Sequence, residues 1–356
     1  MIVGTAAILA AVSLSLSCGA ISARRAILMD ASTGQALYSR DADSRSLVAS
    51  TTKIMTALVV CLECNVLDRM EIPAQAVGIE GSSMYLREGE ELTIQELLYG
   101  LMLSSGNDAA VALAIYCGGT VEGFVELMND QARVLGLSGT HFANPHGLDA
   151  PDHYSTARDL AVLAAYAMGH PVFQRIVSTR TVQAGGRHLT NHNKLLWQVP
   201  GADGVKTGFT KAAGRILVGS ASRDGRRLIS VTIDDGDDWR DHKTLLQQGF
   251  DDFTPTVVVH EGDVLGYMPV LTGVSDRVEL VAREDFTCAL RPGEQVRIQL
   301  PVTPFVYAPV ACGDDAGVAY VYLGDTVLGK VSLTFGSTVE QTPKKHWTQK
   351  FFGGGS

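Results

Sequence analysis

Ser50 and Lys53 are the residues whose types and spacing most directly predict chemistry, because they stand three positions apart ahead of an apolar run. Positions i and i+3 share one face of a helix, so the hydroxyl and the amine become neighbours. A serine is a weak nucleophile until a base takes its proton, and a lysine can be that base when burial, a helix N-terminus or a second cation lowers its pKa. The pair is compatible with nucleophilic catalysis, although serine and lysine are also common surface residues. None of the other eight lysines has a serine three residues earlier, which gives this pair more weight.

A second polar group, Ser105-Gly106-Asn107, follows a predicted helix and can place a hydroxyl and an amide in one cleft. Ser105 would relay a proton to a leaving amine, while Asn107 would bind a substrate amide or Lys53. The same residue types are common in turns, so this motif by itself also has a purely structural interpretation.

The third group, Lys206-Thr207-Gly208, lies in a stretch with the pattern of a strand. On a strand, Lys206 and Gly208 point to the same side. Lys206 would supply a cation for a substrate carboxylate and help to keep Lys53 neutral, and the glycine would let a substrate backbone approach closely. Taken alone, the lysine is equally typical of a solvated strand.

The order of the three groups is more informative than any one of them. Ser-x-x-Lys, Ser-x-Asn and Lys-Thr-Gly together resemble the signature of penicillin-binding proteins and class A β-lactamases. Residues 144–148 and 153–161, and Asn193 with residues 195–197, are similar to stretches of the low-molecular-weight D-alanyl-D-alanine carboxypeptidases. This similarity covers about residues 25–250, and the region after it resembles that family's second domain less specifically.

The resemblance implies an enzyme that removes the terminal D-alanine from peptidoglycan stem pentapeptides and that β-lactam antibiotics inhibit covalently. His192 stands where relatives would have an arginine, which leaves open how the cleft floor handles substrate. No metal or cofactor is expected, since no H-E-x-x-H or Walker A run is present. The implied site residues are Ser50 (nucleophile), Lys53 (general base) and Ser105 for catalysis, and Asn107, Lys206, Thr207, Gly208 and Phe209 for substrate binding, with the N–H groups of Ser50 and Phe209 as the oxyanion hole.

Two other functions share parts of this pattern. A class A β-lactamase would need a deacylating glutamate in an E-x-x-L-N stretch, and residues 126–129 do not fit that pattern. A non-catalytic wall-binding or β-lactam-sensing protein would have no need of the Ser50–Lys53 pair. Three histidines, His146, His153 and His192, are interpreted as backbone-bonding residues, since loop histidines seldom act directly.

The sequence predicts a mixed α/β (α+β) fold of the penicillin-binding/β-lactamase type, in which strands from both ends of the first domain meet in one antiparallel sheet beside a helical block. Thr93 and Glu96 form a predicted capping box, and Asp224-Gly225 a predicted hairpin turn. The expected strands span residues 26–29, 35–38, 204–210, 215–222 and 227–233, and the expected helices span 54–64, 97–102, 109–116, 121–134 and 156–168.

Four segments are predicted along the chain. Residues 1–23 have the apolar run and small residues of a signal peptide, so we expect an extracytoplasmic protein. Residues 24–255 form the serine carboxypeptidase domain, and residues 256–340 a small all-β domain with 11 acidic and 5 basic side chains. The basic, aromatic tail, residues 341–356, suggests peripheral contact with a membrane interface.

Composition excludes some classes of protein. With 46% hydrophobic residues and a net charge of -9, the 356-residue chain is globular and lacks the basic character of a nucleic-acid binder. Its six cysteines are too few for a disulfide scaffold. Cys61 and Cys64 form a C-x-x-C pair, which we interpret as ordinary packing on a helix, and no second pair is present to complete a zinc site.

Overall fold

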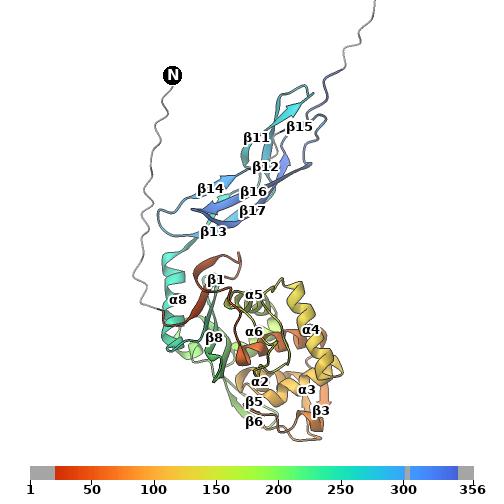
Figure 1. Ribbon diagram of the computed structural model, residues 1–356, viewed down its shortest axis with the longest axis vertical. Helices are drawn as coiled ribbons and strands as arrows, with labels where there is room; N and C mark the ends of the chain where they lie inside the picture. The colour runs from red at the N-terminus through yellow and green to blue at the C-terminus, as the bar shows by residue number, and fades with distance from the viewer. Residues whose placement is uncertain (1–20, 301–304, 344–356) are drawn as a thin grey trace, which may run out of the picture. The chain divides into compact units, whose positions relative to one another are not determined.

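The computed structural model describes residues 21–300 and 305–343, so the predicted leader up to residue 20 and the tail from residue 344 lie outside the described residues (Figure 1). The chain divides into two compact units, Met1–Phe250 and Asp251–Ser356. Each unit has its own sheet, and each is described by itself below.

The first unit contains the predicted antiparallel sheet. Its five strands lie in the order β2-β1-β9-β8-β7, so the N-terminal hairpin pairs with the last strand of the unit, and β7 is an edge strand. Asp224 and Gly225 join β8 to β9 with positive φ values of 51° and 79°, as a type I′ turn requires. The strands are β1 (Arg25–Asp30), β2 (Ala36–Arg40), β7 (Ala202–Thr210), β8 (Gly214–Arg223) and β9 (Arg226–Ile233).

Helices pack beside this sheet, as the apolar patterns predicted. The capping box of Thr93 and Glu96 begins α2. Among the described residues no single helix is long and apolar enough to span a membrane. Two bent helix pairs, α3–α4 and α5–α6, have together the length and apolar composition of a span. The helices are α1 (Lys53–Glu63), α2 (Ile94–Leu103), α3 (Asn107–Gly118), α4 (Val121–Val134), α5 (Ala157–Met168), α6 (Pro171–Ser178), α7 (Leu195–Gln198) and α8 (Asp238–Asp252).

Short elements connect the helices. The turn η1 precedes α1, and two small antiparallel hairpins, β3–β4 and β5–β6, flank the helical block. Their bounds are η1 (Ala49–Thr52), η2 (Ala74–Ala76), β3 (Arg69–Glu71), β4 (Glu91–Thr93), β5 (Thr181–Ala184) and β6 (Arg187–Thr190).

Helix α1 lies at the centre of the first unit's core. Nine of its residues are buried, including Ile54, Met55 and Leu58, which have no exposed surface. A helix that is apolar on all sides must be surrounded by other elements, and α2, α3, α4, α5 and α6 all contact it. The start of α1 is therefore held within this core.

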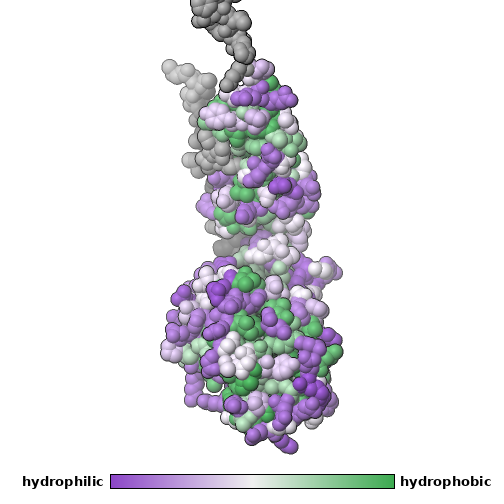
Figure 2. Space-filling model, turned by 90° about the vertical axis from the view of Figure 1, so that its right-hand side faces the viewer, coloured by the Kyte–Doolittle hydropathy of each residue, from purple (hydrophilic) through white to green (hydrophobic). Residues whose placement is uncertain are grey.

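Hydrophobic and hydrophilic residues are intermixed on the face shown in Figure 2.

The second unit is built of strands throughout its described residues, as predicted. One sheet has the order β14-β16-β17-β12-β11-β15, and β10 pairs with β13. In β17, Val331, Leu333 and Phe335 point to the core, as alternate residues of a strand do. The strands are β10 (Thr254–Val259), β11 (Val264–Leu271), β12 (Arg277–Ala282), β13 (Phe286–Leu290), β14 (Val296–Gln299), β15 (Val306–Tyr307), β16 (Asp315–Leu323) and β17 (Thr326–Phe335).

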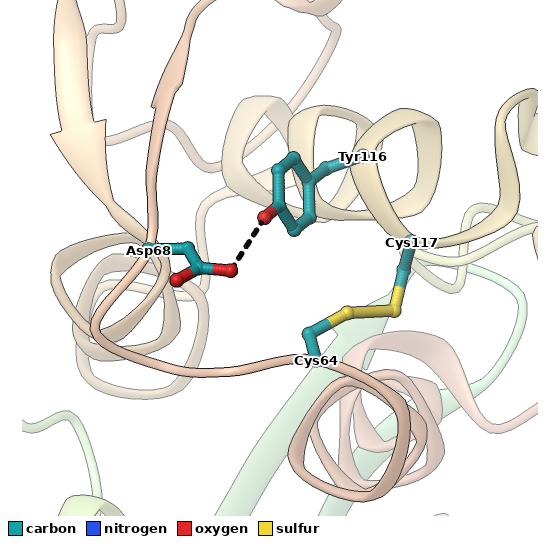
Figure 3. The surroundings of a disulfide bond; sticks show 4 residues. All are labelled: Cys64, Asp68, Tyr116 and Cys117. Atoms are coloured by element: carbon teal, nitrogen blue, oxygen red, sulfur yellow. Dashed lines mark hydrogen bonds between the residues drawn. A yellow bond between two sulfur atoms is a disulfide. The ribbon is translucent and has the colours of Figure 1, made fainter.

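A disulfide bond joins Cys64 to Cys117, so the interpretation of the C-x-x-C pair as ordinary packing is wrong for Cys64 (Figure 3). The helix ends at Glu63, and Cys64 leaves it in extended conformation and meets Cys117 in the last turn of α3. Cys61 remains a buried free thiol. Beside the disulfide, the Tyr116 hydroxyl donates a hydrogen bond to Asp68 Oδ2 at 3.1 Å. The disulfide thus joins the C-terminal ends of α1 and α3.

We predict that the double variant Cys64→Ala/Cys117→Ala folds but loses about 2–4 kcal/mol of unfolding free energy, because the disulfide closes a long loop in the unfolded chain. The two cysteines are 53 residues apart. Denaturant titration under non-reducing conditions measures the loss. The control is Cys312→Ala, which removes an exposed free thiol. Equal midpoints for the double variant and the parent would contradict the prediction.

Candidate active site

Ser50 lies in the turn η1, directly ahead of α1. Ala49 before it has a positive φ of 46°, a strained conformation for a residue with a side chain. The Thr51 hydroxyl donates to the Val48 carbonyl at 2.5 Å and closes the turn. Ser50 Oγ lies 3.1 Å from Lys53 Nζ. The neighbouring positions predicted from the i, i+3 spacing are therefore present.

Lys53 has no exposed surface, although its side chain ends in an amine. Its Nζ lies within hydrogen-bonding distance of Ser50 Oγ, and it donates to Asn107 Oδ1 at 2.7 Å and to the His146 carbonyl at 2.6 Å. All three partners are neutral oxygens. Burial, followed by the charge of Lys206, holds the pKa of Lys53 well below its ordinary value, and Asp108 opposes this shift. These surroundings disfavour the charged ammonium form of Lys53 beside the serine hydroxyl.

Ser105 and Asn107 lie at the junction of α2 and α3. Ser105 has a positive φ of 60°, and Asn107 is the first residue of α3. The Asn107 amide donates to the Glu80 carbonyl at 2.5 Å, and its backbone N–H donates to the Ser82 carbonyl at 2.7 Å. The second motif therefore holds Lys53 from one side and the loop around residues 80–82 from the other.

Asp108 is a buried residue that sequence reasoning missed. Its carboxylate accepts hydrogen bonds from the backbone N–H groups of Met84 and Leu86 at 3.1 and 3.0 Å, and from the Ser83 hydroxyl at 2.5 Å. It follows Asn107 directly, but no local pattern indicates that a loop more than twenty residues earlier would wrap around it. Asp108 fixes this loop against the start of α3.

The third motif lies on β7, the edge strand. Lys206 is 1% exposed, and its Nζ donates to the carbonyl of Thr207 at 2.9 Å. Burial lowers the pKa of Lys206 to about 7. A Cβ added to Gly208 would lie 3.3 Å from both Ala49 Cβ and Ser50 N. The glycine thus accommodates the close approach of the turn that carries Ser50.

A cleft of about 540 Å³ brings most of the predicted residues together. Ser50, Ser105, Thr207, Gly208 and Phe209 line it, while the side chains of Lys53, Asn107 and Lys206 are buried. Its remaining lining residues, which apart from His192 carried no sequence signal, are Ser82, His192, Lys194, Arg215, Ile216, Asp238 and Trp239.

His153 contacts the turn η1, and the backbone carbonyl of His146 accepts a hydrogen bond from Lys53. The backbone N–H of Ala143 donates to His153 Nδ1 at 3.0 Å, and His153 Nε2 lies 2.7 Å from the Thr52 hydroxyl. Burial lowers the pKa of both histidines to about 4, so both are neutral at neutral pH. His192 instead lines the cleft, where burial and the charge of Lys206 lower its pKa. In the described part of the chain, no group of three or more His, Cys, Asp or Glu residues is placed to hold a metal.

Comparison with known proteins identifies the class to which this fold and cleft belong. A family model for D-alanyl-D-alanine carboxypeptidase matches residues 11–237, and the chain belongs to that family. A second model, for the penicillin-binding protein 5 C-terminal domain, matches residues 253–341.

Individual relatives agree over most of the chain. It is 34% identical to D-alanyl-D-alanine carboxypeptidase DacD of Escherichia coli, over 83% of this chain and 81% of that protein. Among solved structures, penicillin-binding protein 5 from Haemophilus influenzae superposes with a TM-score of 0.77 at 32% identity, covering 90% of this chain and 98% of the other. Penicillin-binding protein 6B from Escherichia coli gives 0.72 at 30% identity, with the same coverage.

We predict that Gly147→Ala disrupts the support of the Ser50 turn. Gly147 has a φ of +90°, and an added Cβ would lie 1.9 Å from the Ala49 carbonyl oxygen. Overpacking of this kind costs about 1–3 kcal/mol, in addition to the strain of the positive φ. Thermal unfolding measures the loss. Gly119→Ala is the matched control, since its φ of +73° brings the same strain with open space around it. Equal losses in the two variants would show that the contact with Ala49 is unimportant.

Proposed function

We propose that the protein is a serine-type D-Ala-D-Ala carboxypeptidase that removes the terminal D-alanine from peptidoglycan stem pentapeptides through an acyl-enzyme on Ser50. The observation that carries this proposal is the fully buried Lys53 amine, 3.1 Å from Ser50 Oγ and bonded only to neutral oxygens. A buried, neutral amine beside a hydroxyl is a base in contact with a nucleophile. Membership of the D-alanyl-D-alanine carboxypeptidase family supports the choice of substrate.

Acylation begins when Lys53 takes the proton of Ser50 and Oγ attacks the carbonyl between the two terminal D-alanines. The developing oxyanion is held by the backbone N–H groups of Ser50 and Phe209, and loss of one such donor typically costs about 2.7–4 kcal/mol. Lys206 and Thr207 hold the terminal carboxylate. Asn107 binds a substrate amide and keeps Lys53 in position.

The second half of the reaction releases the products. As the C–N bond breaks, the proton on Lys53 reaches the D-alanine amine through Ser105. A water molecule then gives a proton to Lys53 and attacks the ester carbonyl. As the ester C–O bond breaks, Lys53 returns a proton to Ser50 Oγ, which restores the free serine. β-Lactam antibiotics enter the same cleft and acylate Ser50, and their opened ring stays attached, which makes them covalent inhibitors.

We further propose that the protein works outside the cytoplasm after removal of a leader. The Cys64–Cys117 disulfide supports this, because such bonds persist in oxidising compartments. Ile21 and Ala23 are buried, and the Ala23 N–H donates to Asp241 Oδ2 at 3.2 Å. Cleavage after residue 23 would remove these contacts, so we place the cut ahead of Ile21. The basic, aromatic tail from residue 344 would add peripheral contact with the membrane surface.

We predict one benzylpenicillin adduct per chain, on the peptide that contains Ser50, and both D-alanine release and the adduct lost in Ser50→Ala. Ser50 Oγ forms the acyl bond, so the Ser50→Ala variant has no atom at this position that can be acylated. Intact-mass spectrometry with peptide mapping, together with an assay of free D-alanine, makes the measurement.

Three outcomes would count against this proposal. Rapid consumption of penicillin without an adduct would favour a β-lactamase. Neither adduct nor consumption would favour a protein that only binds the wall. D-Alanine release by Ser50→Ala would exclude the nucleophile. Circular dichroism of the variant separates these results from misfolding.

We also predict that acylation by benzylpenicillin slows as the pH falls, because Lys53 becomes protonated. The charge of Lys206 lowers the pKa of Lys53. Removing that charge in Lys206→Gln raises the pKa of Lys53, so the low-pH limb of the rate profile moves to higher pH. Stopped-flow acylation rates across the pH range, each scaled to its plateau, give the midpoint. Lys243→Gln removes a cation outside the cleft and should leave the midpoint unchanged. An unchanged midpoint in Lys206→Gln would refute the coupling between Lys206 and Lys53.

A further inference from the structure

The cleft continues past the predicted site residues to a pair of cations on one aromatic ring. Lys194 Nζ lies 5.9 Å from the centre of the Trp239 ring, and Arg215 Cζ lies 6.0 Å from it. Both cations line the same cleft as Ser50 and Thr207. An aromatic ring at this distance attracts a cation and limits where its side chain points. The ring therefore favours positions of the Lys194 ammonium at the cleft margin.

The charge of Arg215 is compensated within the protein. Its Nη2 donates to both carboxylate oxygens of Asp238, at 2.6 and 2.9 Å, and its Nε donates to Oδ2 at 3.2 Å. The Asp238 side chain is only 5% exposed. Such a bidentate pair leaves little net charge for a ligand in the cleft. Arg215 is thus already paired with Asp238.

The other basic groups of the site have pKa values below their ordinary ones. Burial lowers the pKa of Lys206 to about 7 and holds that of Lys53 far below its ordinary value. Burial and Lys206 lower the pKa of His192 as well. Lys194 is exposed and forms no ion pair with any residue that the structure describes. It is therefore the cation in this cleft whose charge is neither buried nor paired.

We propose that Lys194, oriented by Trp239, is a positioning residue that draws the terminal carboxylate of the substrate into the cleft. This inference rests on the proposed carboxypeptidase function and adds a second anchor to Lys206. Lys206 is buried on β7 and bonded to the Thr207 carbonyl, so it contacts the carboxylate only once the substrate is seated. Lys194 stands at the open side of the cleft, where an exposed charge acts on the approach and on weak binding.

The test is steady-state hydrolysis of a D-Ala-D-Ala pentapeptide by Lys194→Ala. We expect KM to rise about 3- to 10-fold with kcat nearly unchanged, the size expected for an exposed ionic contact. In this variant KM should also rise steeply as the pH passes 7, because Lys206 then loses its proton and only the neutral Thr207 remains to hold the carboxylate. The parent protein should show a flatter KM profile.

Three comparisons separate this role from a structural one. Lys194→Arg keeps the charge and should restore KM. Lys243→Ala removes an equal charge outside the cleft and should leave KM unchanged. A pentapeptide ending in a carboxamide has no carboxylate to hold, so the parent and Lys194→Ala should process it with equal kcat/KM.

The inference is overturned if KM for the free-acid peptide is unchanged in Lys194→Ala, or if the amide peptide shows the same loss as the acid. A fall in kcat alone would also overturn it. Absence of D-alanine release by the parent protein would be a different failure, since it would defeat the proposed function and this inference with it.

Discussion

Burial of the Lys53 amine is the constraint on which the rest of the first unit depends. An ammonium group in a low-dielectric interior is costly, and a carboxylate partner would stabilise its charged form. This protein instead surrounds the amine with a hydroxyl, an amide oxygen and a backbone carbonyl, and places a second lysine nearby. Each of these groups favours the neutral amine or accepts its hydrogens. The fold is therefore organised around a buried amine whose pKa is lowered by its surroundings.

Three segments that are far apart in the sequence must come together around the Lys53 amine. The apolar helix α1 brings the lysine into the core, α3 begins at the asparagine that accepts from it, and the loop between α4 and α5 supplies the His146 carbonyl. The edge strand β7 then passes close to the turn of Ser50, where a Cβ at position 208 would lie only 3.3 Å from Ser50 N. The packing of the core consequently determines the geometry of the groups in the cleft.

Local rules were enough to predict the parts of this arrangement that depend on neighbours in sequence. The i, i+3 spacing placed Ser50 beside Lys53, the capping box began α2, and the Asp224-Gly225 turn formed its hairpin. The joining of strands from both ends of the unit followed from simple layer rules and is also observed. The family resemblance added the order and roles of the three motifs.

Features that depend on which remote surfaces meet were not predictable. Nothing near Cys64 indicates that the end of α3 lies beside it, and Asp108 gives no sign of the loop it holds. Trp239, Arg215 and Lys194 come from three elements that are brought to one cleft only by the tertiary fold. Their local patterns are those of ordinary surface residues, so sequence periodicity carries no information about their position.

The disulfide also limits how this protein can change in length. Lys53 and Asn107 meet at the beginning of α1 and α3, and Cys64 and Cys117 meet at their ends, 11 and 10 residues further on. At about 1.5 Å per residue, the two helices span nearly the same distance. A residue inserted into or deleted from either helix would turn its end by roughly 100° and separate one of the two meeting points. Substitutions are therefore tolerated along this helix pair far more readily than insertions, and the two helices can lengthen only together.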